Sequence, residues 1–300
     1  MNEFLQQVVN GVAWGSLYAL IALGYTMVYG VLRLINFAHG DVYMIGAMVA
    51  FYAARALVEP GTSTPVTLFA LLALSMTTCG ALGFTIERLA YRPLRHAPKL
   101  TMLITAIGVS LLLENGGQLV FGPDPKFFPM LIETRELSAG SGIVITNVQL
   151  LILAVSLTLM FGLQFLVYRT RLGTALRAVS FSPEAASLMG IDVDRMISLT
   201  FVLGSMLAGA AGVLVGISNP KIDPLMGIMP GLKAFVAAVV GGIGNIPGAM
   251  AGGILMGLSE VMVVGYVSST YRDAIAFVIL IVVLLVRPSG LFGTSLQEKV

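Results

Sequence analysis

The sequence predicts an all-α fold, a polytopic membrane helical bundle of about eight transmembrane helices, within a range of about seven to ten. Of 300 residues, 57% are hydrophobic and only 11% are charged. The mean hydropathy of +0.93 lies far outside the range of soluble domains. Long uncharged runs recur along the chain, and about 20 apolar residues suffice to cross the hydrocarbon core of a bilayer. Because helices satisfy their own backbone groups in lipid, these runs are expected to be helical spans.

The expected spans follow the apolar runs in order. The first run comes directly after MNEFLQQ, which lacks the basic region of a signal peptide, so we expect this helix to remain as a span. The run that contains Glu114 is the one with a charge inside it, and the two shortest runs need neighbouring residues to reach across a membrane. The runs cover residues 4–32, 42–54, 60–86, 100–121, 137–168, 196–220, 234–259 and 274–286.

The distribution of Lys and Arg predicts the orientation. Cytoplasmic loops of membrane proteins carry an excess of these residues. If the spans alternate regularly, about two thirds of the 17 Lys and Arg residues fall on one side, with the N-terminus outside and the C-terminus in the cytoplasm. The loops at residues 122–147 and 218–229 then face outward. The residues on the basic side are Arg33, Arg88, Arg92, Arg95, Lys99, Arg169, Arg171, Arg177, Arg195, Arg287 and Lys299.

Residues 168–195 form a polar loop in an otherwise apolar chain. Ser182 is expected to cap a short helix, with Pro183 at its first position, Glu184 in its first turn and Gly190 at its end. The apolar residues of this helix would suit a shallow groove on another protein, or they would lie flat on the membrane. They are Ala185, Ala186, Leu188, Met189 and Ile191.

Several polar residues interrupt the apolar pattern at membrane depth. Each charged group there costs about 2.5–3.5 kcal/mol on insertion scales, so Glu114 and Glu260 should face protein or water. The alternative for each is a structural hydrogen bond near a helix end. Asn36, His39 and Asp41 form a polar turn before an apolar helix, and Asp41 there favours the helix dipole.

A Gly/Pro-rich break at residues 241–248 contains Asn245. Broken helices in transporters point to the transport path, although a tight loop between two helices explains the pattern equally well. Gly and Pro also leave open a re-entrant segment within residues 220–247, which would change the number of passes.

The composition argues against an enzyme. The chain has no Gly-Lys pair and therefore no phosphate-binding Walker loop, so any ATP hydrolysis must come from partner subunits. With two histidines, His39 and His96, and the single Cys79, a metal site is not expected, and no cofactor is predicted.

Several motifs resemble a known family. Glu184-Ala185-Ala186-x-x-x-Gly190 resembles the EAA-type cytoplasmic loop of bacterial ABC importer permeases, although the Ile-x-Leu-Pro that continues the longer pattern is missing. Further stretches look like the permease subunit of branched-chain amino acid ABC importers, nearly from end to end. They are GSLYALIALGYTMVYGVLRLINFAHGDVYMIGA, IERLAYRPLR, MGIDVDRMISLTFVLGSMLAG, FVAAVVGGIGNIPGAMAGGILMGL and VLLVRPSGLFG.

The resemblance implies a division of labour among subunits. Residues 1–300 would form one permease domain of the bacterial inner membrane, paired with a second, homologous permease and resting on two cytoplasmic ABC ATPases. An extracytoplasmic binding protein would deliver leucine, isoleucine or valine. The coupling loop at residues 168–195 would dock on the ATPases, and its contacts are assigned to Ser182, Glu184, Ala185, Ala186 and Gly190.

Alternating access driven by ATP is the expected mechanism. Branched-chain amino acids are zwitterions with apolar tails, so a path with few polar groups would suffice; the candidates are Asn36, His39, Asn245, Glu114 and Glu260. Urea, short amides or other amino acids are alternative cargoes. In a secondary transporter, Glu114 and Glu260 could instead couple transport to protons, and a purely structural membrane protein is the last alternative.

Overall fold

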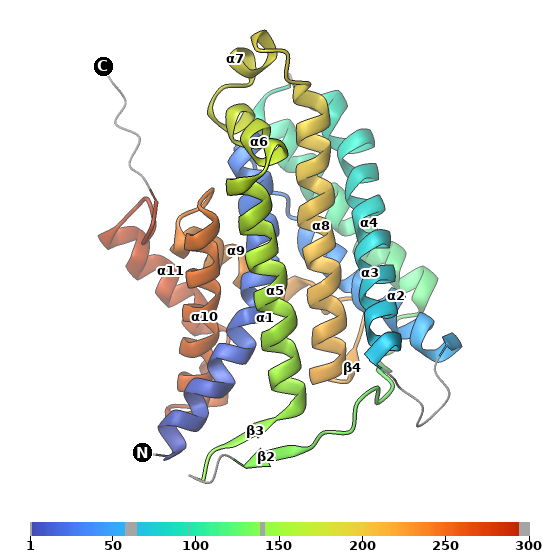
Figure 1. Ribbon diagram of the computed structural model, residues 1–300, viewed down its shortest axis with the longest axis vertical. Helices are drawn as coiled ribbons and strands as arrows, with labels where there is room; N and C mark the ends of the chain where they lie inside the picture. The colour runs from blue at the N-terminus through green and yellow to red at the C-terminus, as the bar shows by residue number, and fades with distance from the viewer. Residues whose placement is uncertain (1, 58–64, 96, 139–141, 294–300) are drawn as a thin grey trace.

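The computed structural model describes residues 2–57, 65–95, 97–138 and 142–293, and it forms a helical bundle (Figure 1). His96 and Lys299 lie outside the described residues. The helices are α1 (Asn2–Leu32), α2 (His39–Leu57), α3 (Pro65–Ile86), α4 (Lys99–Phe121), α5 (Asn147–Arg169), α6 (Arg171–Phe181), α7 (Pro183–Leu188), α8 (Val193–Ser218), α9 (Ile228–Gly241), α10 (Ile246–Tyr266) and α11 (Ala274–Val286).

The lengths and apolar character of these helices confirm the predicted all-α membrane bundle. Six of them are long and apolar enough to cross a membrane, namely α1, α3 with the turns that follow it, α4, α5, α8 and α10. α9 and α11 are shorter apolar helices. With 14 residues, α9 rises only about 21 Å, which is less than the roughly 30 Å of a hydrocarbon core.

Short connections at one end of the bundle form two antiparallel ribbons. β1 (Lys126–Phe127) pairs with β4 (Lys221–Ile222), and β2 (Glu136–Ser138) pairs with β3 (Val144–Thr146). The apolar run at residues 137–168, expected as one span, is therefore divided between this second ribbon and α5. Thr146 begins α5 with a capping box, since its Oγ1 accepts from the N–H of Gln149 while the Gln149 side chain accepts from the N–H of Thr146.

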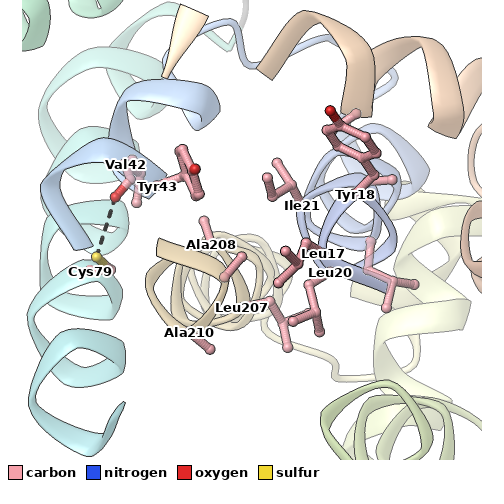
Figure 2. Packing of buried hydrophobic residues seen from close by; sticks show 14 of the residues in the cluster. Leu17, Tyr18, Leu20, Ile21, Val42, Tyr43, Cys79, Leu207, Ala208 and Ala210 are labelled. Atoms are coloured by element: carbon pink, nitrogen blue, oxygen red, sulfur yellow. Dashed lines mark hydrogen bonds between the residues drawn. The ribbon is translucent and has the colours of Figure 1, made fainter. Parts of the chain in front are cut away.

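α8 lies at the centre of the bundle. α1 and α8 are buried over 78% of their most apolar stretch, whereas α4 and α5 are buried over only 17% and 28%. Figure 2 shows Leu207 of α8 directed toward Leu17 and Leu20 of α1, with α2 and α3 on the opposite side. Cys79 of α3 is fully buried there and donates to the carbonyl oxygen of Val42 at 3.4 Å.

Small residues allow α8 to approach its neighbours closely. A Cβ atom added at Gly212 would lie 2.5 Å from the carbonyl oxygen of Tyr43 and 2.7 Å from the backbone nitrogen of Ala47, both in α2. A Cβ atom added at Gly204 would lie 3.2 Å from the Cα atom of Gly24 in α1. Such close backbone contact is how membrane helices associate.

The two ends of the bundle differ in charge as the sequence predicts. α6 and α7 lie at one end and the ribbons lie at the other (Figure 1). Arg92 and Arg95, which follow α3, pair with Asp194 at the start of α8, so the two basic loops share one end. Which end faces the cytoplasm stays a prediction.

We expect Gly212→Ala to destabilise the bundle, because its methyl group would meet backbone atoms of α2 that cannot rotate away. Overpacking of this kind costs about 1–3 kcal/mol. Gly108→Ala in α4 is the matched control, since an added Cβ there meets nothing within 4 Å. The thermal unfolding midpoint of the purified chain in detergent should fall for Gly212→Ala and stay level or rise for Gly108→Ala. Equal midpoints would contradict the close packing of α8.

Candidate functional site

The polar loop at residues 168–195 folds into two short helices that precede α8. α6 begins after Thr170, whose Oγ1 accepts from the N–H of Gly173 at 3.1 Å. Ser182 then starts α7, because its Oγ accepts from the N–H of Ala185 at 3.2 Å. The predicted helix start at Ser182 is therefore confirmed, whereas α6 has no counterpart among the expected helices.

α7 ends at a glycine, also as predicted. Gly190 has φ +82°, a left-handed conformation that glycine adopts without a Cβ penalty. Its N–H donates to the carbonyl of Ser187 at 2.9 Å, and the N–H of Ile191 donates to the carbonyl of Ala186 at 3.0 Å. These two bonds form a Schellman motif, which satisfies the last carbonyls of the helix and turns the chain toward α8.

The apolar residues of α7 do not share one surface, contrary to the expectation of a single partner-facing patch. Ala186 is only 3% exposed and packs inside the chain, whereas Leu188 is 90% and Met189 is 82% exposed. Glu184 is exposed, and its carboxylate accepts a hydrogen bond from the Ser182 hydroxyl at 3.1 Å. A six-residue helix seated on its neighbours must bury one side, and spacing alone does not show which side that is.

A cluster of charges joins the start of α8 to the end of α3. Asp194 accepts from both Arg92 and Arg95, and Arg95 also donates to Glu87. Glu87 is fully buried and accepts a further hydrogen bond from the Ser198 hydroxyl at 2.6 Å. Because α7 leads into α8 through a short turn, this cluster ties the start of α8, next to α7, to the end of α3.

A cavity of about 310 Å³ opens at the opposite end of the bundle. This volume lies at the low end of the range for small-molecule sites, about 300–1,000 Å³. Its walls combine apolar side chains with charged ones. The lining residues are Trp14, Leu17, Tyr18, Ile21, Tyr43, Val215, Asn219, Lys221, Asp223, Met226, Met229, Pro230, Lys233, Arg272 and Asp273.

Three charged side chains, Lys233, Arg272 and Asp273, meet on one wall of this cavity, and Glu260 joins them from behind. Lys233 of α9 and Glu260 of α10 are 4% and 3% exposed, and their Nζ and Oε2 atoms are 3.0 Å apart. Lys233 also pairs with Asp273 at 2.7 Å, and Arg272 pairs with Glu260 at 2.5 Å. The Tyr18 hydroxyl donates to Glu260 at 2.8 Å. We call Lys233, Glu260, Arg272 and Asp273 the outer charge cluster.

Sequence patterns singled out one member of this cluster, Glu260. In the sequence, Lys233 directly precedes the uncharged run at residues 234–259, so it looked like the last residue of the loop before that run. The structure instead places it in the second turn of α9, inside the apolar bundle. A lone lysine within an apolar helix was the signal that could have marked it.

Asn36 and His39 lie inside the protein beside aromatic rings. Asn36 Oδ1 accepts from the Tyr91 hydroxyl at 3.0 Å. The His39 ring packs edge-on against Tyr25, with 4.8 Å between ring centres. Both residues are almost fully buried, at 2% and 1% exposure. Their part in a transport path stays a prediction.

Asn245 and Glu114 lie elsewhere. Asn245 caps α10, since its Oδ1 accepts from the N–H of Gly248 at 3.0 Å while its Nδ2 donates to the carbonyl of Phe292 at 2.9 Å. These bonds support the tight-loop interpretation. Glu114 is half-buried on α4. One turn earlier on α4, the Ser110 hydroxyl donates a hydrogen bond to Asp41 of α2. Within the described ranges, no group of three His, Cys, Asp or Glu side chains could hold a metal ion.

Comparison with known proteins gives consistent matches over nearly the full chain. The family model described as branched-chain amino acid transport system / permease component matches residues 7–284. The chain is 46% identical to the high-affinity branched-chain amino acid transport system permease protein BraD of Pseudomonas aeruginosa over 99% of this chain and 98% of that protein. It is 45% identical to LivH of Escherichia coli, with the same coverage.

A more distant relative also matches over nearly the full chain. The probable branched-chain amino acid transport permease protein LivH of Methanocaldococcus jannaschii is 31% identical over 96% of this chain and 92% of that protein. The resemblance that the sequence motifs indicate is thus confirmed, and the chain belongs to the branched-chain amino acid transport permease family.

Proposed function

We propose that this chain is the membrane-spanning permease subunit of an ATP-driven importer for leucine, isoleucine and valine. The observation that carries the proposal is the match to branched-chain amino acid permeases across 99% of the chain. The cavity between apolar side chains and a charge cluster suits a small zwitterion with an aliphatic tail. Import of urea, short amides or other amino acids is the main alternative.

The partners in this proposal are a second, homologous permease, two cytoplasmic ABC ATPases and an extracytoplasmic binding protein. The ATPases would contact α7, which presents Leu188 and Met189 almost fully exposed. Large apolar side chains projecting from a polar segment favour a protein contact. The absence of a Gly-Lys pair from the sequence agrees with ATP hydrolysis on separate subunits.

The end that bears α6 and α7 would face the cytoplasm. The basic residues around Arg92 and Arg195 support this orientation under the positive-inside rule. The cavity and the ribbons would then face outward, where a binding protein releases its cargo.

α8 would transmit the motion from one side to the other. Closure of the ATPase pair displaces α7, and the capped turn at Asp192 passes this displacement to α8. With 26 residues, α8 extends about 39 Å, and Val215 near its far end lines the cavity. The paired charges of Asp194 and Arg92 carry the same displacement to the end of α3. The cavity thus alternates between outward and inward openings.

Reconstitution tests the function. Proteoliposomes that hold the assembled complex and a leucine-loaded binding protein should accumulate leucine only when ATP is available to the ATPases. Isoleucine and valine should compete, whereas urea and short amides should not. Leucine flux through the chain alone without ATP would favour a secondary transporter, and competition by urea or amides would indicate the alternative cargo.

Leu188→Asp should abolish ATP-driven uptake and prevent copurification of the ATPase subunits. Because Leu188 is 90% exposed, the unfolding midpoint of the bundle should be unchanged. Met130→Asp is the matched control, since Met130 is 81% exposed near the opposite end and should leave ATPase binding intact. Ala186→Asp should instead lower the stability of the loop itself. If Leu188→Asp retains both the ATPases and uptake, the docking surface lies elsewhere.

Asp194→Asn should lower the uptake obtained per ATP hydrolysed while the ATPases remain bound, because the link to Arg92 and Arg95 is weakened. Its effect on stability should stay within about 1 kcal/mol, since Asp194 is 44% exposed and solvent screens the pair. Arg195→Gln removes a neighbouring surface pair with Asp192 and should behave as wild type. Equal uptake per ATP in the Asp194→Asn and Arg195→Gln variants would show that the ion pairs of Asp194 take no part in coupling.

Cysteine labelling tests the orientation. Cys79 is the only cysteine of the chain and is fully buried, so the wild-type protein should not react with a membrane-impermeant maleimide. In intact spheroplasts, Met130→Cys should be labelled, whereas Arg195→Cys should be labelled only after the membrane is broken. The opposite pattern would reverse the orientation.

A further inference from the structure

The outer charge cluster consists of two pairs with different surroundings. Lys233 and Glu260 are buried and belong to the helices α9 and α10. Arg272 and Asp273 are neighbours in the connection before α11, and their side chains are 47% and 53% exposed. Each member of the exposed pair contacts the buried residue of opposite charge. The buried pair is thus covered by one cation and one anion from a single short segment.

Stability alone is a weak reason to keep such a cluster. Removing charges from water is costly, and apolar side chains of similar volume often replace a buried ion pair without loss of stability. Ionisable residues inside membrane proteins are therefore functional candidates by default. Lys233 also lines a cavity with room for a small molecule, and Glu260 contacts Lys233 and Arg272 from directly behind that wall.

We propose that the Arg272–Asp273 pair occupies the head-group subsite of the cavity, and that a zwitterionic α-amino acid takes its place during transport. The carboxylate of the amino acid would pair with Lys233 and its ammonium group with Glu260. The exchange substitutes one cation and one anion for another such pair, so the cluster stays neutral throughout. This inference rests on the proposed function and adds the residues that bind the substrate.

The rest of the cavity suits an aliphatic side chain. Leu17 and Ile21 of α1 and Met226 and Met229 near the start of α9 are among its lining residues. Methionine adapts its shape to irregular ligands. An apolar wall beside a neutral charge cluster suits a zwitterion with an aliphatic side chain, as in the branched-chain amino acids.

The chain carries a natural reporter at this site. Trp14 is the only tryptophan of the sequence, and it lines the cavity. The guanidinium carbon of Arg272 lies 5.7 Å from the centre of a Trp14 ring. Displacement of Arg272 by a substrate removes a cation from this ring and should change its emission.

The test titrates leucine into the assembled complex in nanodiscs, without the binding protein. Trp14 emission should change saturably with leucine, and the change should be absent in Trp14→Phe, which separates it from the tryptophans of the partner subunits. Leucinamide lacks the carboxylate and isocaproate lacks the ammonium group, so each should bind more weakly than leucine.

Equilibrium binding of radiolabelled leucine to the same complex separates the roles of the two pairs. Lys233→Met and Glu260→Gln should each weaken binding at least about tenfold, because a substrate charge loses its partner. The double variant Arg272→Gln/Asp273→Asn should bind leucine several-fold more tightly, since the competing pair is gone. Arg135→Gln, which removes an exposed ion pair near the same end, is the control and should match wild type.

The outcomes distinguish this inference from the proposed function. If wild-type complexes import leucine but neither Lys233→Met nor Glu260→Gln alters binding, the subsite is wrong and the importer function stands. Weaker binding in the Arg272→Gln/Asp273→Asn variant, equal to that of Lys233→Met, would show that the four charges are structural and would overturn the proposal. Failure of ATP-dependent leucine import by wild type would instead reject the function.

Discussion

The close packing of α8 is the constraint on which the rest of the structure depends. Gly212 brings the backbone of α8 against α2, where an added methyl group has no room, and Gly204 brings it against α1, where an added methyl group would fit only tightly. Tightly packed interiors transmit displacement because they have few alternative arrangements. α8 begins beside α7, the proposed docking helix, and ends beside the cavity, so a rigid α8 would connect the two proposed sites.

Each end of α8 lies near a group of four charges that sum to zero. At its start, Arg92 and Arg95 balance Glu87 and Asp194. Near its far end, the outer charge cluster balances Lys233 and Arg272 with Glu260 and Asp273. A neutral group of charges can exchange partners without leaving a net charge in a region of low dielectric, which would be costly. Both ends can thus change contacts while the middle keeps its packing.

Local sequence signals predicted the local structure well. Most of the long apolar runs correspond to single helices, although the runs at residues 137–168 and 234–259 are each divided, the second between α9 and α10. Ser182 and Gly190 mark the two ends of α7 because their capping roles depend only on nearby backbone atoms. Charge distribution also predicted correctly that the loops with Arg92 and Arg195 share one end. These features arise from interactions within a few residues or from the regular alternation of spans.

Spatial relations between distant residues were predicted less well. Ala186 was expected on the docking surface, but it is buried, because the tertiary contacts of α7 decide which side faces outward. Asn245 was a candidate for the path, and its hydrogen bonds now explain it as a helix cap. Lys233 was overlooked since its partners, Glu260 and Asp273, are 27 and 40 residues away in sequence. No single-sequence pattern brings such residues together.

Close packing resists deformation, whereas ion pairs can exchange partners. This difference explains why tight packing lies along α8 and charge clusters lie near its two ends. Interdigitated backbones such as Gly212 against α2 resist sliding, so α8 would move as a unit in the proposed coupling. The pair of Arg272 with Glu260 joins a half-exposed guanidinium to a buried carboxylate, so Arg272 can leave at low cost only where another cation takes its place. The bundle therefore keeps its resistance to deformation in the core and its ability to switch at the two ends. The proposed importer needs both properties, since the ATPases would act at one end and the cargo would be held and released at the other.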